Sequence, residues 1–262
     1  MQVSSLLISK DKYFERHLNV SRQEANELHT RYYKDYGLAI EGMVRHHKVD
    51  ALEYNKQVDD ALPLENILSH NEELRQFLQD IDKSKVKMWL LTNAYVTHGK
   101  RVVKLLGVDD LFEGITFCDY GALPFLCKPA PDMYKKAMTE AGVSDVKDCF
   151  FVGEYNCTFQ DYAETHGTLD DSALNATGAE RFGWTAVHLV EPDAVPPPKP
   201  ASKHTVRNLE ELRQLFPQFF KSSAQNNSQH DTSSDARKAS INDNVIGASA
   251  DADSHAPNGR AS

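Results

Sequence analysis

Short apolar runs alternate with helical stretches from residue 85 onward, and this alternation constrains the fold more than any other feature of the sequence. Each run is continuous, as in Lys87–Leu91 (KMWLL), which indicates a strand buried on both faces. The strands are predicted at 87–91, 114–118, 149–152 and 185–190, with helices between them at 96–106, 131–141 and 172–181. This order predicts an α/β fold with a parallel, doubly wound sheet, in which ligands bind at the carboxyl ends of the strands.

Residues 11–75 show helical periodicity and no strand pattern. Ser21 followed by Glu24 fits a capping box, and Asp50 is a predicted N-cap for a later helix. We therefore predict an all-helical subdomain over 1–75 and a sheet-containing core over 76–221. A chain of 262 residues, 40% of them hydrophobic, is sufficient for one α/β domain with a small accessory domain.

The end of the chain has a different composition. Residues 222–262 are rich in Ser, Asn, Asp and Ala and contain few large apolar residues, so we expect a disordered tail. Before the tail, leucines and a phenylalanine at helical spacing predict a short amphipathic helix over 207–220.

Composition narrows the classes of partner. The formal net charge of −9 argues against a nucleic-acid partner, although a local positive site can still bind a phosphorylated small molecule. No apolar run reaches transmembrane length, so no membrane partner is expected. The four cysteines show no paired metal-ligand spacing and do not suggest a disulfide framework. Three of them sit in or beside apolar runs and are expected to be buried free thiols. Nothing in the sequence indicates the oligomeric state.

Polar side chains follow two of the predicted strands. Thr92 and Asn93 come directly after the first strand, where a hydroxyl and backbone amides before a helix can bind an anion. A threonine at such a position is more commonly only a helix cap. Lys128 precedes a Pro-Ala-Pro turn and a helix, where a held lysine could neutralise phosphate charge. The simpler reading of Lys128 is a solvated surface residue.

An acidic pair follows the third predicted strand at a distance. Asp170 and Asp171 are adjacent carboxylates, which are suitable oxygen ligands for Mg²⁺, although most such pairs are solvated turns. Residues 153–169 separate this pair from the strand and have no apolar period, so we interpret them as an insertion. A translated intron and a genuine surface insertion both remain open explanations. Glu154 and Asp161, inside the insertion, are weaker candidates for metal ligands.

In combination these motifs resemble the haloacid dehalogenase superfamily. They occur in the order LLTNA at 90–94, CKPAPDMYKKAM at 127–138, DDS at 170–172 and GWTAVHLV at 183–190. The helical segment at 32–64 (YYKDYGLAIEGMVRHHKVDALEYNKQVDDALPL) is similar to the cap of the fungal pyrimidine 5'-nucleotidase group of that superfamily. The resemblance covers roughly 11–221 and implies a Rossmann-like core with an all-helical cap.

The resemblance implies a Mg²⁺-dependent phosphomonoesterase that acts on nucleoside 5'-monophosphates, with a pyrimidine nucleotide as its small-molecule partner. An aspartate nucleophile would form an aspartyl-phosphate, while Mg²⁺ and a lysine offset the phosphoryl charge. By this resemblance, Thr92 and Lys128 would take part in catalysis and bind phosphate, and Asn93 would bind phosphate through its backbone amide. Asp170 and Asp171 would bind Mg²⁺. Tyr36, Gly37 and Leu38 of the cap would select the substrate.

Two departures from the family pattern bear on activity. The family's chain opens with an apolar strand that ends in an Asp-x-Asp motif, and nothing before Asp11 matches it. We therefore expect a core without its first, central strand, with two unpaired inward edges in the sheet. The insertion at 153–169 is the second departure, because it separates Asp170 from the strand end. For both reasons we expect the 262 residues to be inactive or nearly so.

Two other functions are compatible with the same residues. One is a non-catalytic remnant that binds phosphometabolites or a protein partner through the cap, Thr92 and Lys128. The other is a phosphatase for a different small phosphomonoester, because one fold can host many substrates. The N-terminus has a short apolar patch without a basic leader, so we expect a cytoplasmic protein, with the nucleus as a second location.

Overall fold

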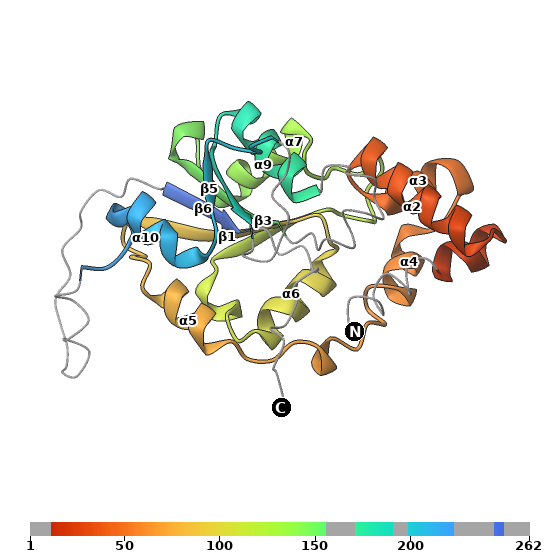
Figure 1. Cartoon of the computed structure of the whole chain (residues 1–262), viewed down its shortest axis with the longest axis horizontal. Helices are drawn as coiled ribbons and strands as arrows, with labels where there is room; N and C mark the ends of the chain where they lie inside the picture. The colour runs from red at the N-terminus through yellow and green to blue at the C-terminus, as the bar shows by residue number, and fades with distance from the viewer. Residues whose placement is uncertain (1–11, 156–170, 191–198, 223–243, 249–262) are drawn as a thin grey trace.

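A six-stranded parallel sheet forms the centre of the protein. The computed structural model describes residues 12–155, 171–190, 199–222 and 244–248. The strand order is β2-β1-β6-β3-β4-β5, and every pair of neighbours is parallel (Figure 1). The strands are β1 (Val86–Thr92), β2 (Gly114–Phe117), β3 (Cys149–Tyr155), β4 (Thr185–Val190), β5 (His204–Val206) and β6 (Asn244–Ala248). The predicted α/β fold is confirmed, and the four predicted strands correspond to β1–β4.

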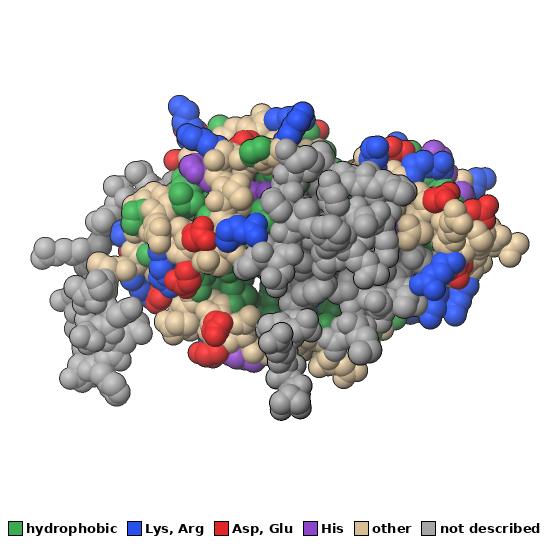
Figure 2. Space-filling model, viewed as in Figure 1, with side chains coloured by type: hydrophobic (Ala, Val, Ile, Leu, Met, Phe, Trp, Pro, Cys, Tyr) green, Lys and Arg blue, Asp and Glu red, His purple; other side chains and the backbone are tan. Residues whose placement is uncertain are grey.

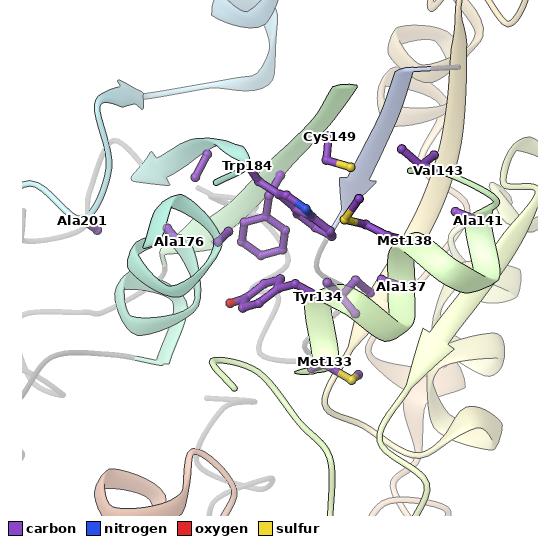
Figure 3. Packing of buried hydrophobic residues seen from close by; sticks show 14 of the residues in the cluster. Met133, Tyr134, Ala137, Met138, Ala141, Val143, Cys149, Ala176, Trp184 and Ala201 are labelled. Carbon is purple, nitrogen blue, oxygen red and sulfur yellow. The ribbon is translucent and has the colours of Figure 1, made fainter. Parts of the chain in front are cut away.

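Helices cover both faces of the sheet, as a doubly wound fold requires. The helices of the core are α5 (Glu72–Gln79), α6 (Val96–Leu105), α7 (Pro131–Ala141), α9 (Asp171–Phe182) and α10 (Leu212–Leu215). Side chains from α7 and α9 bury Leu91, Phe151 and Ala186 on one face of the sheet. Figure 3 shows this cluster, in which the Tyr134 and Trp184 rings lie edge to face with centroids 5.2 Å apart. Side chains from α5, α6 and α10 bury Met88 and Leu90 on the other face.

The helical subdomain lies beyond one end of the sheet (Figure 1). It contains a helix over 12–18, followed by α2 (Arg22–Tyr36), α3 (Ala39–His47) and α4 (Ala51–Gln57). The predicted capping box is confirmed, because the Ser21 hydroxyl accepts from the Glu24 amide and the Glu24 carboxylate accepts from the Ser21 amide. Asp50 caps α4 as predicted. The outer surface carries Lys and Arg interspersed with Asp and Glu (Figure 2). Apolar side chains form an internal cluster that also includes Cys118, Tyr120, Phe125 and Cys127 from the segment after β2.

The boundary between the two parts lies before residue 75. Among residues 12–75, the last member of the cluster that fills the helical subdomain is Val58. Phe77 and Leu78 of α5 belong instead to the cluster on the sheet, and a short 3-10 helix, η1 (Leu64–Asn66), connects the two parts. The predicted boundary at 75/76 therefore falls inside a core helix, because helical periodicity alone does not show which partner a helix packs against.

The predicted helix over 207–220 is broken into short turns. The segment forms η4 (Leu209–Glu211), α10 and η5 (Pro217–Phe219). Pro217 has no amide hydrogen to continue the helical bonding and ends the α-helical part. The apolar side chains still pack on the sheet as predicted, since Leu212 and Phe219 are buried there. Two further 3-10 turns, η2 (Asp109–Leu111) and η3 (Val146–Asp148), precede β2 and β3.

Strand β6 lies within the stretch that we predict to be disordered. It occupies the position between β1 and β3, so along 244–248 the expectation of a disordered tail is wrong. The two inward edges predicted to be unpaired are paired with this strand. Open strand edges present rows of backbone donors and acceptors that attract any extended segment. Average composition over 222–262 hides the five-residue run NVIGA, which is compatible with a strand.

Burial of His188 in β4 makes the stability of the fold dependent on pH. The ring is fully buried, and burial lowers the pKa of His188 from 6.5 to about 4. The unfolded chain binds this proton more tightly, so the stabilisation is complete above pH 6.5 and is lost as the pH falls toward 4. The expected loss is about 3 kcal/mol. Urea unfolding between pH 4 and 7 should show that the free energy of unfolding depends less on pH in His188→Leu than in wild type. Equal pH dependence in the two proteins would contradict this role of His188.

Candidate active site

The carboxyl end of β1 carries the first two predicted site residues. Thr92 is the last residue of β1 and is fully buried, and its hydroxyl accepts a hydrogen bond from the Ala94 amide at 3.0 Å. Helix α6 begins later, and its N-cap is Tyr95, which makes no side-chain capping bond. The helix-cap reading of Thr92 is therefore wrong: the hydroxyl holds the turn that leaves the strand.

Asn93 holds the backbone of Lys128 by two hydrogen bonds. The Asn93 side-chain amide donates to the Lys128 carbonyl at 2.9 Å, and the Lys128 amide donates to Asn93 Oδ1 at 2.7 Å. Both residues are buried, so these bonds satisfy main-chain groups that water does not reach. The sequence predicts only a backbone role for Asn93. The structure shows that its side chain joins the end of β1 to the turn after β2.

Lys128 is a buried cation at this junction. Its side chain is fully buried, and Nζ donates to the Leu91 carbonyl at 3.1 Å. The ammonium also lies over the Phe151 ring, 5.4 Å from the centroid, which stabilises a cation electrostatically. The reading of Lys128 as a solvated surface lysine is therefore wrong. Burial of an ammonium is costly, so a residue of this kind is a candidate for function.

The helical subdomain touches this junction through the turn between α2 and α3. Gly37 has φ +75°, and a Cβ atom at this position would lie 2.8 Å from the Lys128 carbonyl oxygen. The Cys127 thiol donates to the Tyr36 carbonyl at 3.7 Å. Leu38 is buried in the cluster of the subdomain. The three cap residues predicted from the resemblance thus lie on a turn that contacts the predicted phosphate-binding lysine.

The Tyr36 side chain belongs to a polar and aromatic group on the cap. Its hydroxyl is 2.7 Å from His46 Nε2, and the Arg45 guanidinium lies 5.0 Å from the centre of its ring. Arg45 also forms an ion pair with the buried Glu41 carboxylate. Tyr36 is therefore held from two sides in a half-buried position.

Substitution of Gly37 tests the contact between cap and core, with Gly142 as a matched control. Both glycines end helices at similar φ values, +75° and +76°, but a Cβ at Gly142 would meet nothing within 4 Å. Gly142→Ala should cost about 1 kcal/mol for the left-handed backbone, and Gly37→Ala about 1–3 kcal/mol more because of crowding. Urea unfolding of the two variants measures the difference. Equal losses would show that the cap turn is not packed tightly against the Lys128 backbone.

The predicted Mg²⁺ ligands lie largely outside the described residues. Asp170 falls outside them, and Asp171 is described only as the first residue of α9. Within 12–155, 171–190, 199–222 and 244–248, no group of three or more His, Cys, Asp or Glu side chains could hold a metal ion. The expectation of Mg²⁺ therefore still depends on Asp170 and Asp171. Asp161, the weaker candidate ligand, also falls outside the described residues. The start of the predicted insertion is part of the sheet, because Gly153 and Tyr155 continue β3 beside β4.

A buried thiol pair beside Lys128 is a feature that sequence reasoning missed. Cys118 and Cys127 are both buried in the cluster that joins the cap to the core. A hydrogen bond with Cys127, together with burial, raises the pKa of the Cys118 thiol far above its ordinary range. The predicted free thiols are confirmed for these two and for Cys149. Their positions at either end of the turn after β2 could not be deduced from sequence spacing.

Comparison with known proteins identifies the class. A family model described as haloacid dehalogenase-like hydrolase matches residues 4–154, which is more than half of the chain. The chain therefore belongs to the haloacid dehalogenase-like hydrolases, as the sequence motifs predict. It is 36% identical over 192 residues to Phosphate metabolism protein 8 of Saccharomyces cerevisiae, an alignment that covers 70% of this chain. The chain spans about half of that relative's length, 54%.

Two solved structures show limited similarity. One is a dehalogenase with an intermediate complex, with 18% identity, a TM-score of 0.47 and coverage of 84% of each chain. The other is a HAD phosphatase from Thermococcus onnurineus, with 18% identity, a TM-score of 0.43 and coverage of 82% of this chain and 90% of that one. Separately, none of the helices in the described part of the chain has the length and apolar character needed to cross a membrane.

Proposed function

We propose that this hydrolase is a Mg²⁺-dependent phosphomonoesterase for nucleoside 5'-monophosphates, with pyrimidine nucleotides preferred. The observation that carries the proposal is the placement of Lys128, whose buried ammonium bonds the Leu91 carbonyl next to Thr92. Gly37 of the cap lies close to the backbone of the same lysine, since a Cβ atom at this position would be 2.8 Å from the Lys128 carbonyl oxygen. A cation and a hydroxyl that suit a phosphoryl group therefore lie beside the element that can contact the rest of a substrate.

Each group has a simple chemical role in this proposal. Lys128 offsets the negative charge of the phosphoryl group, and Thr92 bonds one of its oxygens through the hydroxyl. Asn93 is a positioning residue, because it fixes the Lys128 backbone. Mg²⁺ bound by Asp170 and Asp171 would add positive charge at the same end of the sheet. Tyr36 and Leu38 would contact the leaving group. We propose the cytoplasm as the location, with the nucleus as a second one.

We further propose that the 262 residues by themselves turn over substrate slowly or not at all. The motifs that match the family contain no counterpart of the nucleophilic aspartate, which turnover requires. A phosphate can still bind without that aspartate. Substrate binding and turnover are therefore separate expectations. Similarity to a relative named for phosphate metabolism supports a phosphorylated substrate.

The test measures binding and turnover on the same preparation. Cytidine and uridine 5'-monophosphate should raise the Tm in the presence of Mg²⁺. Cytidine without phosphate should not, and Thr92→Val should reduce the effect. Phosphate release from either nucleotide should stay near the background rate. Rapid Mg²⁺-dependent release would overturn the proposed inactivity and leave the substrate class in place.

The same measurements separate the alternatives. Equal stabilisation by purine nucleotides or a sugar phosphate would favour a phosphatase for a different small phosphomonoester. Binding of nucleotide without turnover, both here and after an apolar Asp-x-Asp strand is fused to the N-terminus, would favour the non-catalytic binding protein. No binding of any phosphomonoester would overturn the proposal.

A further inference from the structure

One face of α6 binds the segment of chain that leaves the cap. Thr97 and Arg101 lie four residues apart in this helix and therefore project from the same side. The Thr97 hydroxyl donates to Asp60 Oδ1 at 2.9 Å, and the Asn55 side-chain amide donates to Asp60 Oδ2 at 2.9 Å. Asn55 is a buried residue of α4, so Asp60 joins the last helix of the cap to a helix of the core.

Arg101 makes the larger set of contacts with residues 60–65, the connecting segment. Its guanidinium donates to the carbonyl oxygens of Asp60 at 3.0 Å and Leu62 at 2.8 Å. It also donates twice to the Glu65 carboxylate, at 2.9 and 2.5 Å. Arginine suits such a role, because its planar group presents five donors in a fixed arrangement. One side chain of the core thus fixes three residues of the connecting segment.

Apolar side chains beside Arg101 attach the same segment to α6. Leu62 and Leu64 are buried against Val102, the next residue of the helix. Apolar burial is not directional, whereas hydrogen bonds to main-chain carbonyls fix how a backbone is oriented. Among the described residues, the chain between α4 and α5 is the covalent connection from cap to core, and its path past α6 can be followed in Figure 1. The bonds of Arg101 therefore act on the element that carries the cap.

The cap touches the core at a second place, the turn between α2 and α3. A Cβ atom at Gly37 would lie 2.8 Å from the Lys128 carbonyl oxygen, and the Cys127 thiol donates to the Tyr36 carbonyl at 3.7 Å. A body attached at one place can pivot about it, and a second attachment removes most of that freedom. The bonds of Arg101 and the contact at this turn together determine where the turn lies relative to the predicted phosphate site.

We propose that Arg101 is a positioning residue for the cap, on which recognition of the nucleoside part of a substrate depends but recognition of its phosphate does not. The dependence on the nucleoside rests on the proposed function, which assigns the leaving group to the cap. Phosphate is bound by Lys128 and Thr92, at the ends of the turn and strand of the core. Loss of the Arg101 guanidinium leaves these groups in place and loosens the turn at Gly37. A nucleotide then loses contacts that inorganic phosphate never makes.

The thiol of Cys127 provides a readout that needs no ligand. It is buried and bonded to the cap turn, so an alkylating reagent reaches it when that contact opens. Cys149 is also buried, but it belongs to the cluster on α7 and α9 and reports opening of the core. The ratio of the two labelling rates therefore measures loosening of the cap separately from loss of overall stability.

The first experiment compares Arg101→Met with Arg75→Met in the full chain. Arg75 is a matched control, because its guanidinium also bonds a carbonyl and a carboxylate, those of Gly107 and Asp110, but both lie in the core. The two arginine side chains are similarly exposed, 27% for Arg101 and 23% for Arg75. After N-ethylmaleimide labelling and mass spectrometry, the ratio of rates should rise about tenfold in Arg101→Met, a typical coupling between two sites. Arg75→Met should leave it unchanged.

The second experiment titrates the same proteins with inorganic phosphate and with cytidine 5'-monophosphate in the presence of Mg²⁺, and follows the Tm. Arg101→Met should bind the nucleotide about tenfold more weakly and inorganic phosphate as tightly as wild type. Thr97→Val removes the hydroxyl that bonds Asp60 and should act in the same direction. Thr97→Ser keeps the hydroxyl and should behave as wild type.

Two outcomes would overturn the proposal. One is a labelling ratio that Arg101→Met raises no more than Arg75→Met does. The other is an equal loss of affinity for inorganic phosphate and for the nucleotide. If wild type binds neither ligand, the proposed function is wrong, and the labelling ratio still decides whether Arg101 positions the cap. If Arg101→Met does not fold by circular dichroism, Thr97→Val against Thr97→Ser makes the same comparison.

Discussion

Lys128→Met is expected to abolish phosphate binding while changing the free energy of unfolding by less than about 1.5 kcal/mol. Methionine keeps the length of the buried stem and removes the ammonium that bonds the Leu91 carbonyl. Loss of one hydrogen bond and relief of a buried charge partly offset each other. Lys128→Ala should instead lower the free energy of unfolding by about 2–5 kcal/mol, because the side chain is fully buried and its removal leaves a cavity.

The measurement is the rise of Tm with inorganic phosphate, combined with urea unfolding. Lys87→Met is a matched control on the same strand, since Lys87 Nζ also donates to a backbone carbonyl, that of Ala141, at 2.9 Å. Lys87→Met should retain the full phosphate effect. If Lys128→Met retains it too, Lys128 has only a structural role and the proposed phosphate site is wrong.

Asn93→Ala should produce the second large effect, a loss of about 2–5 kcal/mol in the free energy of unfolding together with weakened phosphate binding. The substitution leaves both the amide and the carbonyl of Lys128 without their side-chain partner in a buried location. Asn93→Asp keeps one acceptor and loses the donor, so it should be nearly as destabilising. Both changes free the Lys128 turn from the end of β1.

Asn71→Ala is the control, because it also removes a side-chain hydrogen bond to the backbone but lies away from the contact between Asn93 and Lys128. Asn71 Oδ1 accepts from the Leu74 amide at 2.9 Å at the exposed start of α5. Its removal should cost about 1 kcal/mol and leave the phosphate effect unchanged. A loss at Asn93→Ala no greater than at Asn71→Ala would mean that the two bonds to Lys128 do not hold the site together.

Local rules identified most of the elements and the composition of the site. Continuous apolar runs identified β1–β4, and Pro131 and Gly142 marked the two ends of α7. Thr92, Asn93 and Lys128 could be named because ligands in parallel sheets bind where strands end. Each of these inferences uses residues close together in the chain, where backbone preferences and periodicity act directly.

The boundary near residue 75, the burial of Lys128 and the place of β6 could not be found in this way. Phe77 looks the same in sequence whether α5 packs on the cap or on the sheet. Lys128 looks like any exposed lysine until Asn93 and Gly37 enclose its backbone.

For this protein the sequence by itself determined the α/β class, the helical cap and the family, because periodicity, capping residues and motif order are local properties of the chain. Only the tertiary structure decided that Asn93 joins two strand ends, that the cap turn at Gly37 rests on Lys128, and that 244–248 completes the sheet. These features depend on which groups meet across long sequence separations. There, the need to satisfy buried backbone groups selects partners that no local pattern specifies.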